Sequence, residues 1–130
     1  MKADLPAAAV RPLSLLAGIM DFSTGILLMA DPRFTCRLMG LTAVSDTAFL
    51  PFVGAFVTAV GLSYLWGLWR RSLRATWEFT ALVRCIIGIF VAIAVGRGSM
   101  AAGWLPVTVT DLGLSALQII FLRNGWVRDE

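Results

Sequence analysis

The segment WEFTALVRCIIGIFVAIAV, from Trp77 to Val95, decides how this chain is organised. Since a helix rises about 1.5 Å per residue, this segment would extend about 28 Å as a helix, close to the hydrocarbon thickness of a bilayer. Glu78 lies near the membrane edge, whereas Arg84 lies well inside the run. We therefore predict a transmembrane helix that carries a charged side chain inside the bilayer.

Three other segments share this length and apolar character: Leu13 to Ala30, Ala48 to Trp69 and Trp104 to Leu122. The connections at 70–76 and 96–103 are short, so the helices that they join must run antiparallel. The sequence predicts an all-α integral membrane protein, a four-helix up-down-up-down bundle, with a single transmembrane domain over 1–130.

The connection between the first two spans predicts a short helix, at about 32–39, that lies on the membrane surface. Asp31 can cap this helix, Pro32 suits its first position and Gly40 can end it. Residues 45–47, Ser-Asp-Thr, then supply a cap for the second span.

The composition excludes several classes of protein. Hydrophobic residues make up 58% of the chain and charged residues 15%, more apolar surface than one soluble core can hide, so the excess must face lipid. The chain has no histidine, which excludes the usual haem ligand, the commonest metal ligand and every His-based triad. Cys36 and Cys85 lie in a connection and in a span, and predict neither a disulfide nor a thiolate metal site. We expect no cofactor, no metal and no nucleic acid.

The basic residues lie at the ends of the predicted spans and indicate the orientation of the bundle. Arg33, Arg37 and Arg97 fall on one side of the membrane. The side with both termini carries more of them: Lys2, Arg11, Arg70, Arg71, Arg74, Arg123 and Arg128. By the positive-inside rule we expect a multi-pass protein of the plasma (inner) membrane with both termini in the cytoplasm. Because Asp21 interrupts the first apolar run, we interpret that run as a span and not as a secretory signal.

Polar and small side chains recur at helical spacing, which places them on one face of each helix. The face in the fourth span contains Trp104, Thr108, Asp111, Ser115 and Gln118. The corresponding faces of the first and third spans contain Ser14, Gly18, Asp21 and Gly25, and Trp77, Thr80 and Arg84. The second span has Gly54, Thr58 and Gly61, small residues that let two helices approach closely.

Three ionisable side chains share a depth in the membrane. From the helical rise, Asp21, Arg84 and Asp111 lie about 12, 10 and 16 Å from the end of the bundle that holds the termini. Each such charge costs roughly 2.5 to 3.5 kcal/mol at the bilayer centre. We expect the three groups to meet, with the two acids holding one proton between them. A buried ion pair that only fixes the register of the bundle is the structural alternative.

Several short motifs are similar to those of one family of membrane proteins. They are Gly18-Ile-Met-Asp21, Ala30-Asp31-Pro32, Arg37-Leu-Met-Gly40, Phe52-Val-Gly54-Ala55-Phe56 and Gly61-Leu62. With them the chain resembles the small DoxX-like four-helix membrane proteins over most of its length. The resemblance implies a four-helix bundle and little about activity. The segment from Trp77 to Arg84, and Asp111 with Gln118, are more particular than the general pattern of that family.

The acid, arginine, acid set is also similar in its chemistry to the site of limonene epoxide hydrolases, which have a different, soluble fold. In that family one Asp activates water, the other protonates the epoxide oxygen and the Arg bridges them. The similarity implies catalytic roles for Asp21, Arg84 and Asp111, with the assignment of acid and base left open. Side chains expected to position water or substrate are Tyr64, Trp77, Thr108, Ser115 and Gln118.

Our preferred hypothesis is therefore a membrane-embedded, cofactor-free enzyme that opens an epoxide, or carries out a related isomerisation or cyclisation, on a lipophilic small molecule. One alternative is an accessory subunit that packs on a larger membrane complex through its glycine faces. Others are a small proton-coupled transporter and a lipid-binding or sensing protein. The expected partners are the lipid bilayer and the lipophilic substrate, and a homo-oligomer stays open because small-residue faces pack equally well within and between chains.

Overall fold

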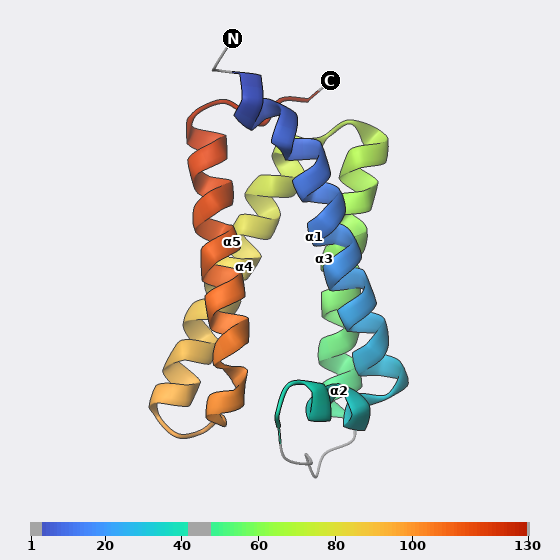
Figure 1. Cartoon of the computed structure of the whole chain (residues 1–130), viewed down its shortest axis with the longest axis vertical. Helices are drawn as coiled ribbons and strands as arrows, with labels where there is room; N and C mark the ends of the chain where they lie inside the picture. The colour runs from blue at the N-terminus through green and yellow to red at the C-terminus, as the bar shows by residue number, and fades with distance from the viewer. Residues whose placement is uncertain (1–3, 42–47, 130) are drawn as a thin grey trace.

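The computed structural model describes residues 4–41 and 48–129, and within them every regular element is a helix. The long helices are α1 (Asp4–Ala30), α3 (Phe49–Arg70), α4 (Leu73–Gly96) and α5 (Leu105–Arg123), and the short ones are α2 (Pro32–Leu38) and the 3-10 helix η1 (Ala102–Trp104). The prediction of an all-α four-helix bundle is confirmed (Figure 1).

The four long helices alternate in direction. Both termini and the α3–α4 turn lie at one end of the bundle, and α2 and the α4–α5 connection lie at the other (Figure 1). The helices associate mainly as two antiparallel pairs, α1 with α3 and α4 with α5, and α3 joins the pairs through a smaller contact with α4. We refer to the end that holds both termini as the terminal end.

The helix boundaries extend the predicted spans. The helix α1 begins at Asp4 and continues through Pro12, although that residue has no backbone N–H to donate. Its early turns have a packing role, because Val10 is buried. At the other end of the bundle Asp31 caps α2, since its Oδ1 accepts a hydrogen bond of 2.9 Å from the backbone N of Phe34. The predicted cap at 45–47 lies outside the described residues.

Each of the four long helices is long and apolar enough to cross a membrane. Large apolar side chains cover the outer surface of the bundle, and among them Phe56 on α3, Phe90 on α4 and Val109 on α5 are 61%, 64% and 72% exposed. Such surfaces are stable against lipid chains and not against water. The chain is therefore a multi-pass membrane protein whose outer faces contact the bilayer.

Glycine faces close the α1–α3 interface. A Cβ atom built on Gly61 would lie 2.4 Å from the backbone N of Phe22, and one on Gly25 would lie 2.5 Å from the backbone N of Thr58. Gly54 is equally restricted, with the carbonyl oxygen of Gly25 2.7 Å from its built Cβ. The two backbones are therefore in direct contact, which larger side chains would prevent.

The segment after α5 folds back over the terminal end. Val127 is 3% exposed and belongs to a core cluster with Val10, Leu73 and Trp77. The Oδ1 atom of Asp129 accepts a hydrogen bond of 2.9 Å from the backbone N of Arg74, at the first turn of α4. This tail therefore joins the start of α1 to the start of α4.

Arg71 ends α3 in the left-handed conformation, with φ of 57°. The backbone N of Ser72 donates to the carbonyl of Gly67 at 3.0 Å, so the turn is of the Schellman type, in which glycine is the usual residue at this position. A side chain here costs roughly 1 kcal/mol or more. Arg71, a large charged residue, therefore occupies a position where the backbone conformation favours glycine, which has no side chain.

Candidate functional site

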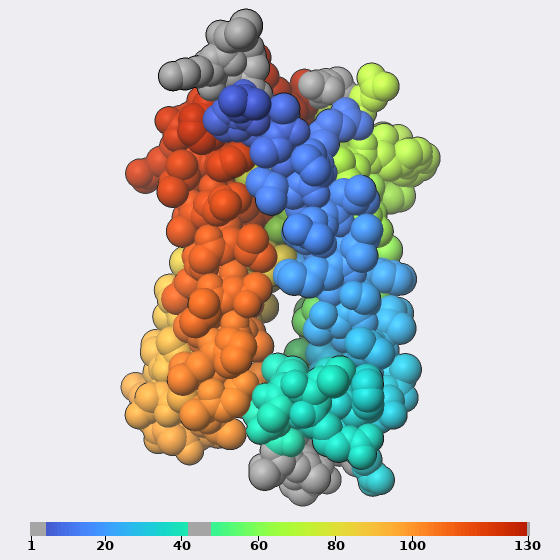
Figure 2. All heavy atoms as spheres, in the orientation of Figure 1, coloured from blue at the N-terminus to red at the C-terminus, as the bar shows by residue number. Residues whose placement is uncertain are grey.

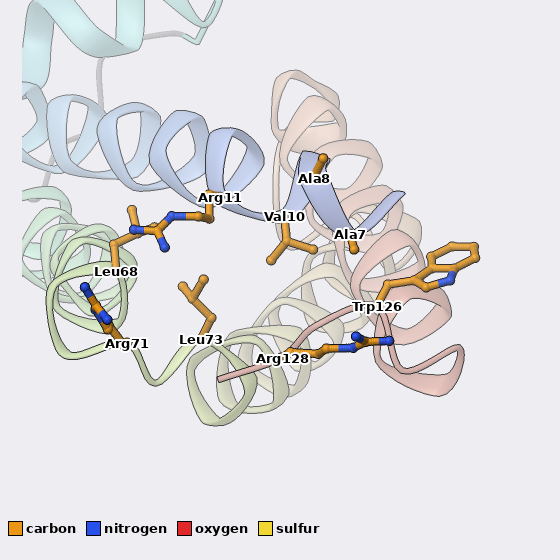
Figure 3. Close-up of a pocket in the computed structure, with 9 residues that line it drawn as sticks. All are labelled: Ala7, Ala8, Val10, Arg11, Leu68, Arg71, Leu73, Trp126 and Arg128. Atoms are coloured by element: carbon orange, nitrogen blue, oxygen red, sulfur yellow. The ribbon is translucent and has the colours of Figure 1, made fainter. Parts of the chain in front are cut away.

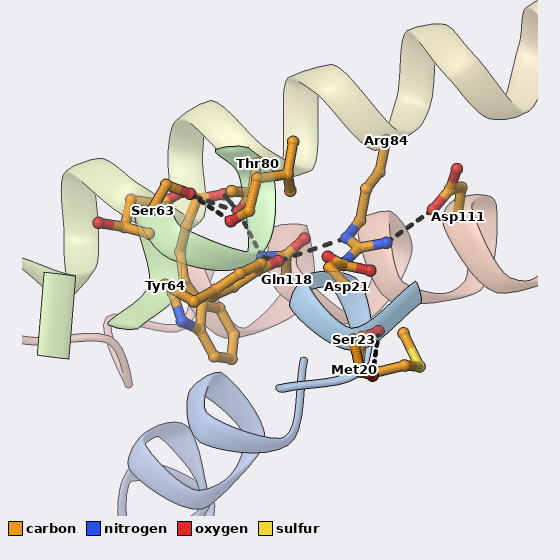
Figure 4. Close-up of polar contacts among 12 residues, drawn as sticks. Met20, Asp21, Ser23, Ser63, Tyr64, Thr80, Arg84, Asp111 and Gln118 are labelled. Carbon is orange, nitrogen blue, oxygen red and sulfur yellow. Dashed lines mark hydrogen bonds and ion pairs between the residues drawn. The ribbon is translucent and has the colours of Figure 1, made fainter. Parts of the chain in front are cut away.

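Arg84 lies at the centre of a polar cluster between the two helix pairs (Figure 4). It extends from α4, and its Nη1 atom donates to Oδ1 of Asp111 on α5 at 2.6 Å. Its Nη2 atom donates to Oδ2 of Asp21 on α1. The structure thus brings together the three charges that the sequence placed at one depth, with one nitrogen of the guanidinium for each carboxylate.

Tyr64 from α3 fixes the third nitrogen of the guanidinium. The Arg84 Nε donates to the Tyr64 hydroxyl oxygen at 3.3 Å, and the guanidinium carbon lies 5.8 Å from the centroid of the tyrosine ring. All four long helices therefore contribute to the cluster, and the plane of the guanidinium is determined by three separate partners. Such a group is held in one orientation before any ligand binds.

Gln118 and Thr80 extend the cluster toward the terminal end (Figure 4). The Gln118 Nε2 donates to the Tyr64 hydroxyl and to the Thr80 Oγ1, both at 2.8 Å. Within the described part of the chain, Gln118 Oε1 is the only buried side-chain nitrogen or oxygen without a hydrogen-bond partner. Thr80 is an addition to the predicted site, although its position on the same face as Arg84 pointed to it.

Ser115 and Thr108 use their hydroxyl protons to hold α5 against α4. The Ser115 Oγ donates to the carbonyl of Ala81 at 2.9 Å, and the Thr108 Oγ1 donates to the carbonyl of Gly88 at 3.3 Å. These hydroxyls can still accept a hydrogen bond from water or substrate, but their donors are engaged.

Trp77, also a predicted site residue, lies in the core cluster with Val10, Leu73 and Val127, which we call the terminal-end core, and does not hydrogen-bond the guanidinium. Its side chain is 1% exposed, its Nε1 donates to the Ser14 Oγ at 2.7 Å, and its ring stacks on Phe121 with centroids 5.7 Å apart. The Ser14 Oγ in turn donates to the carbonyl of Val10 at 2.7 Å. The hydrogen bond to Ser14 satisfies a tryptophan N–H that would otherwise be buried without a partner.

The cluster is buried but not sealed. The Arg84 side chain is 4% exposed, whereas those of Asp21 and Asp111 are 11% and 14% exposed. Figure 2 shows an opening between α5 and the C-terminal half of α1, the two helices that carry these acids. We call this feature the lateral opening. At the end of the bundle opposite the termini the structure closes again, because Trp104 of η1 packs against the cluster of Leu28, Cys36, Leu41 and Leu50.

The guanidinium of Arg84 lies between the two carboxylates. Among the described residues, no group of three or more acid, histidine or cysteine side chains could hold a metal. Cys36 is buried on α2 and Cys85 lies on α4, and both are free thiols. Two carboxylates bound by one guanidinium can support proton transfer and charge stabilisation by the side chains themselves.

Comparisons of the chain with protein-family models, with curated proteins and with solved structures find no match.

Proposed function

We propose that this chain is a membrane-embedded, cofactor-independent enzyme that uses acid-base catalysis on a lipophilic small molecule, with hydrolysis of an epoxide as the preferred reaction. The observation that carries the proposal is the bridging of two carboxylates from different helices, Asp21 and Asp111, by the single guanidinium of Arg84. A neutral cluster needs one proton on the two carboxyls, and hydrocarbon surroundings favour neutrality. One carboxyl can then donate a proton while the other accepts one.

The proposed reaction consumes one water and one epoxide. The ionised carboxylate accepts a proton from water as the water oxygen bonds to a carbon of the epoxide ring. The carbon–oxygen bond of the ring breaks, and the protonated carboxyl donates its proton to the departing oxygen, which gives a diol. Exchange of the proton between the two acids restores the starting state, and Arg84 stays charged throughout.

Tyr64 and Gln118 are the groups best placed to orient the reactants. The Tyr64 hydroxyl accepts hydrogen bonds from both Arg84 and Gln118, which leaves its own proton to donate. Gln118 Oε1 is an acceptor without a partner in the described structure. A donor and an acceptor beside the acid pair match the needs of a water molecule or a substrate oxygen.

The lateral opening supports a lipophilic substrate. It separates α1 from α5 on a surface rich in exposed apolar side chains, so a molecule dissolved in the bilayer would enter between the two helices that carry the acids without crossing water (Figure 2). The excess of arginine at the terminal end supports a plasma (inner) membrane location with that end in the cytoplasm. Membership of the DoxX-like family is part of this proposal, since it rests on the sequence motifs alone.

The alternative of an accessory subunit is less well supported because the glycine faces are used inside the chain. Gly18, Gly25, Gly54 and Gly61 all face the α1–α3 interface. They are therefore not available to a second protein.

The test is turnover of a panel of lipophilic epoxides by the protein in lipid nanodiscs, with Asp21→Asn and Asp111→Asn as the main variants. We expect each variant to lose about 100-fold to 10,000-fold in kcat, the usual contribution of a general acid or base. Isotopically labelled water in a single turnover separates direct attack by water, which labels the diol, from attack by a carboxylate, which does not label it in the first turnover.

Glu78→Gln is the matched control, because it neutralises an exposed carboxylate that pairs with Arg74 outside the cluster. It should leave kcat unchanged. If both Asn variants turn over epoxides at the wild-type rate and only unfold at lower temperature, the cluster is a structural ion pair and the proposed function is wrong.

A further inference from the structure

A second site candidate lies at the terminal end, away from the acid cluster. A cavity of about 210 Å³ opens there between the first turns of α1, the α3–α4 turn and the tail after α5. Three of its lining residues are arginines, Arg11, Arg71 and Arg128, one from each of these segments (Figure 3). None of its lining residues, all within the described structure, is acidic.

The floor of this pocket is apolar and fixed. Val10 and Leu73 are 3% and 5% exposed and belong to the terminal-end core. Trp126 forms a wall and packs edge-to-face on Phe121, with centroids 5.1 Å apart. The pocket therefore combines a rigid hydrophobic surface with three cationic groups around it (Figure 3).

The orientation rule for membrane proteins does not account for this arrangement. It explains an excess of arginine on one side of the membrane, but not why arginines from three separate segments line one cavity. Arg71 adds an independent observation, because it holds a left-handed backbone position that glycine would occupy with less strain. Strain of this kind is concentrated at functional sites.

The pocket lies at the depth of lipid headgroups. Trp66 and Trp69, on the last turns of α3, are 60% and 71% exposed and flank the lining residue Leu68. Exposed tryptophans at the end of a spanning helix mark the interface between hydrocarbon and water. A ligand bound here would meet both the polar surface and the start of the acyl chains.

We propose that this pocket binds the phosphate-bearing headgroup of an anionic amphiphile. Guanidinium groups bind phosphate oxygens through paired, charge-assisted hydrogen bonds, and the apolar floor suits the first carbons that follow a headgroup. The cavity is smaller than the usual site for a drug-sized molecule, so it takes the headgroup and leaves the chains in the bilayer.

This site is independent of the acid cluster. Along α1, Arg11 and Asp21 are separated by about 15 Å of helical rise. Between them the Ser14 and Trp77 side chains are 0% and 1% exposed, so no open path connects the two sites along this face. Binding at the terminal end can therefore be measured without reference to catalysis.

The experiment measures binding by native mass spectrometry with three probes: phosphatidylglycerol, phosphatidylcholine and water-soluble glycerol phosphate. We expect phosphatidylglycerol to bind about ten-fold or more tightly than phosphatidylcholine. Arg71→Gly and Arg128→Gln should each weaken it roughly ten-fold, the loss expected for one charge-assisted contact. Arg71→Gly is informative because glycine relaxes the backbone there, so lost binding cannot be attributed to lost folding.

The matched controls are Arg70→Gln and Arg123→Gln, which remove the same charge from the same end of the bundle but lie outside the cavity. They should change the affinity less than about two-fold. Glycerol phosphate binding with the same dependence on Arg71 and Arg128 would identify a free phosphate ester as the ligand, and binding of the lipid alone would identify the membrane as its source. Equal effects of pocket and control variants, or no preference for phosphatidylglycerol, would overturn the proposal.

Discussion

The two sides of α1 differ in how they meet their neighbours. On the side of α3, the backbones touch through Gly25, Gly54 and Gly61, and no space is left. On the side of α5, the lateral opening separates the C-terminal half of α1 from α5, and the guanidinium of Arg84, which comes from a third helix, binds an acid on each of the two. Close packing of backbones through glycine leaves no space between α1 and α3. Ion pairs through the long side chain of Arg84 hold α1 and α5 together and leave space for a ligand.

The largest effect is expected from replacing a glycine in the α1–α3 interface with a larger residue. Gly61→Leu places a side chain where even a Cβ lies 2.4 Å from the backbone of α1, so the helices must separate along their length. We expect loss of folded, monodisperse protein in size-exclusion chromatography.

Gly113→Leu is the matched control for this change, because a Cβ on Gly113 meets nothing within 4 Å. It should purify like the wild type. Normal behaviour of Gly61→Leu would contradict the close contact of α1 with α3.

The next largest effect is expected from removing the guanidinium of Arg84, which binds Asp21 and Asp111. Arg84→Met leaves two carboxyls facing each other across the gap, and removal of one partner from a buried ion cluster costs about 3 to 5 kcal/mol. We expect a corresponding loss in the free energy of unfolding, measured by denaturant titration in detergent.

The triple variant Asp21→Asn, Arg84→Met, Asp111→Asn tests the cause, because it removes the charges together. It should recover most of the lost stability while remaining inactive on epoxides. If the triple variant is no more stable than Arg84→Met, the loss arises from packing and not from charge.

A smaller effect is expected in the terminal-end core. Trp77→Phe removes the donor to Ser14 and should cost about 0.5 to 1.5 kcal/mol in the free energy of unfolding. Trp66→Phe, at a side chain that is 60% exposed, should cost less. A double variant with Ser14→Ala checks the assignment, since the loss from Trp77→Phe should shrink when its acceptor is already absent.

The smallest effect belongs to the pair α4 and α5. Ser115→Ala removes a hydrogen bond between two helices, which is worth about 0.6 kcal/mol on average in membrane proteins. Ser23→Ala, which loses only a bond within its own exposed helix turn, is the control. A loss well above about 1.7 kcal/mol, the largest seen for such bonds, would mean that Ser115 does more than join two helices.

The sequence carried enough information to place the charge cluster because two simple quantities determine it. The helical period put Asp21, Arg84 and Asp111 on inward faces, and the rise per residue put them at similar depths. The hydrogen-bond partners of the other polar side chains on these faces could not be predicted from the same two quantities. The bond between Trp77 and Ser14, and the use of the Ser115 hydroxyl by a backbone carbonyl, depend on the rotation and separation of helices, which a period does not encode.

The terminal end was harder to predict because no periodic pattern marks it. The tail that holds Val127 and Asp129 has neither the length of a span nor the alternation of a strand, so nothing in the sequence showed that it folds back. The helical turns of α1 before Pro12 also lie outside the predicted span, which begins at Leu13. The pocket with three arginines depends on how these segments meet in space, which no local pattern of the sequence encodes.

The burial of Val127 also sets an order of events during synthesis. This residue leaves the ribosome after all four long helices, yet it shares a core cluster with Val10, which lies in the first of them. Membrane insertion of the helices can therefore precede completion of the terminal-end core, and the arginine pocket, which needs Trp126 and Arg128, is the last part of the described structure to form. A fusion partner joined directly after Arg123 would leave this core open, whereas one joined beyond Asp129 through a flexible linker would preserve it.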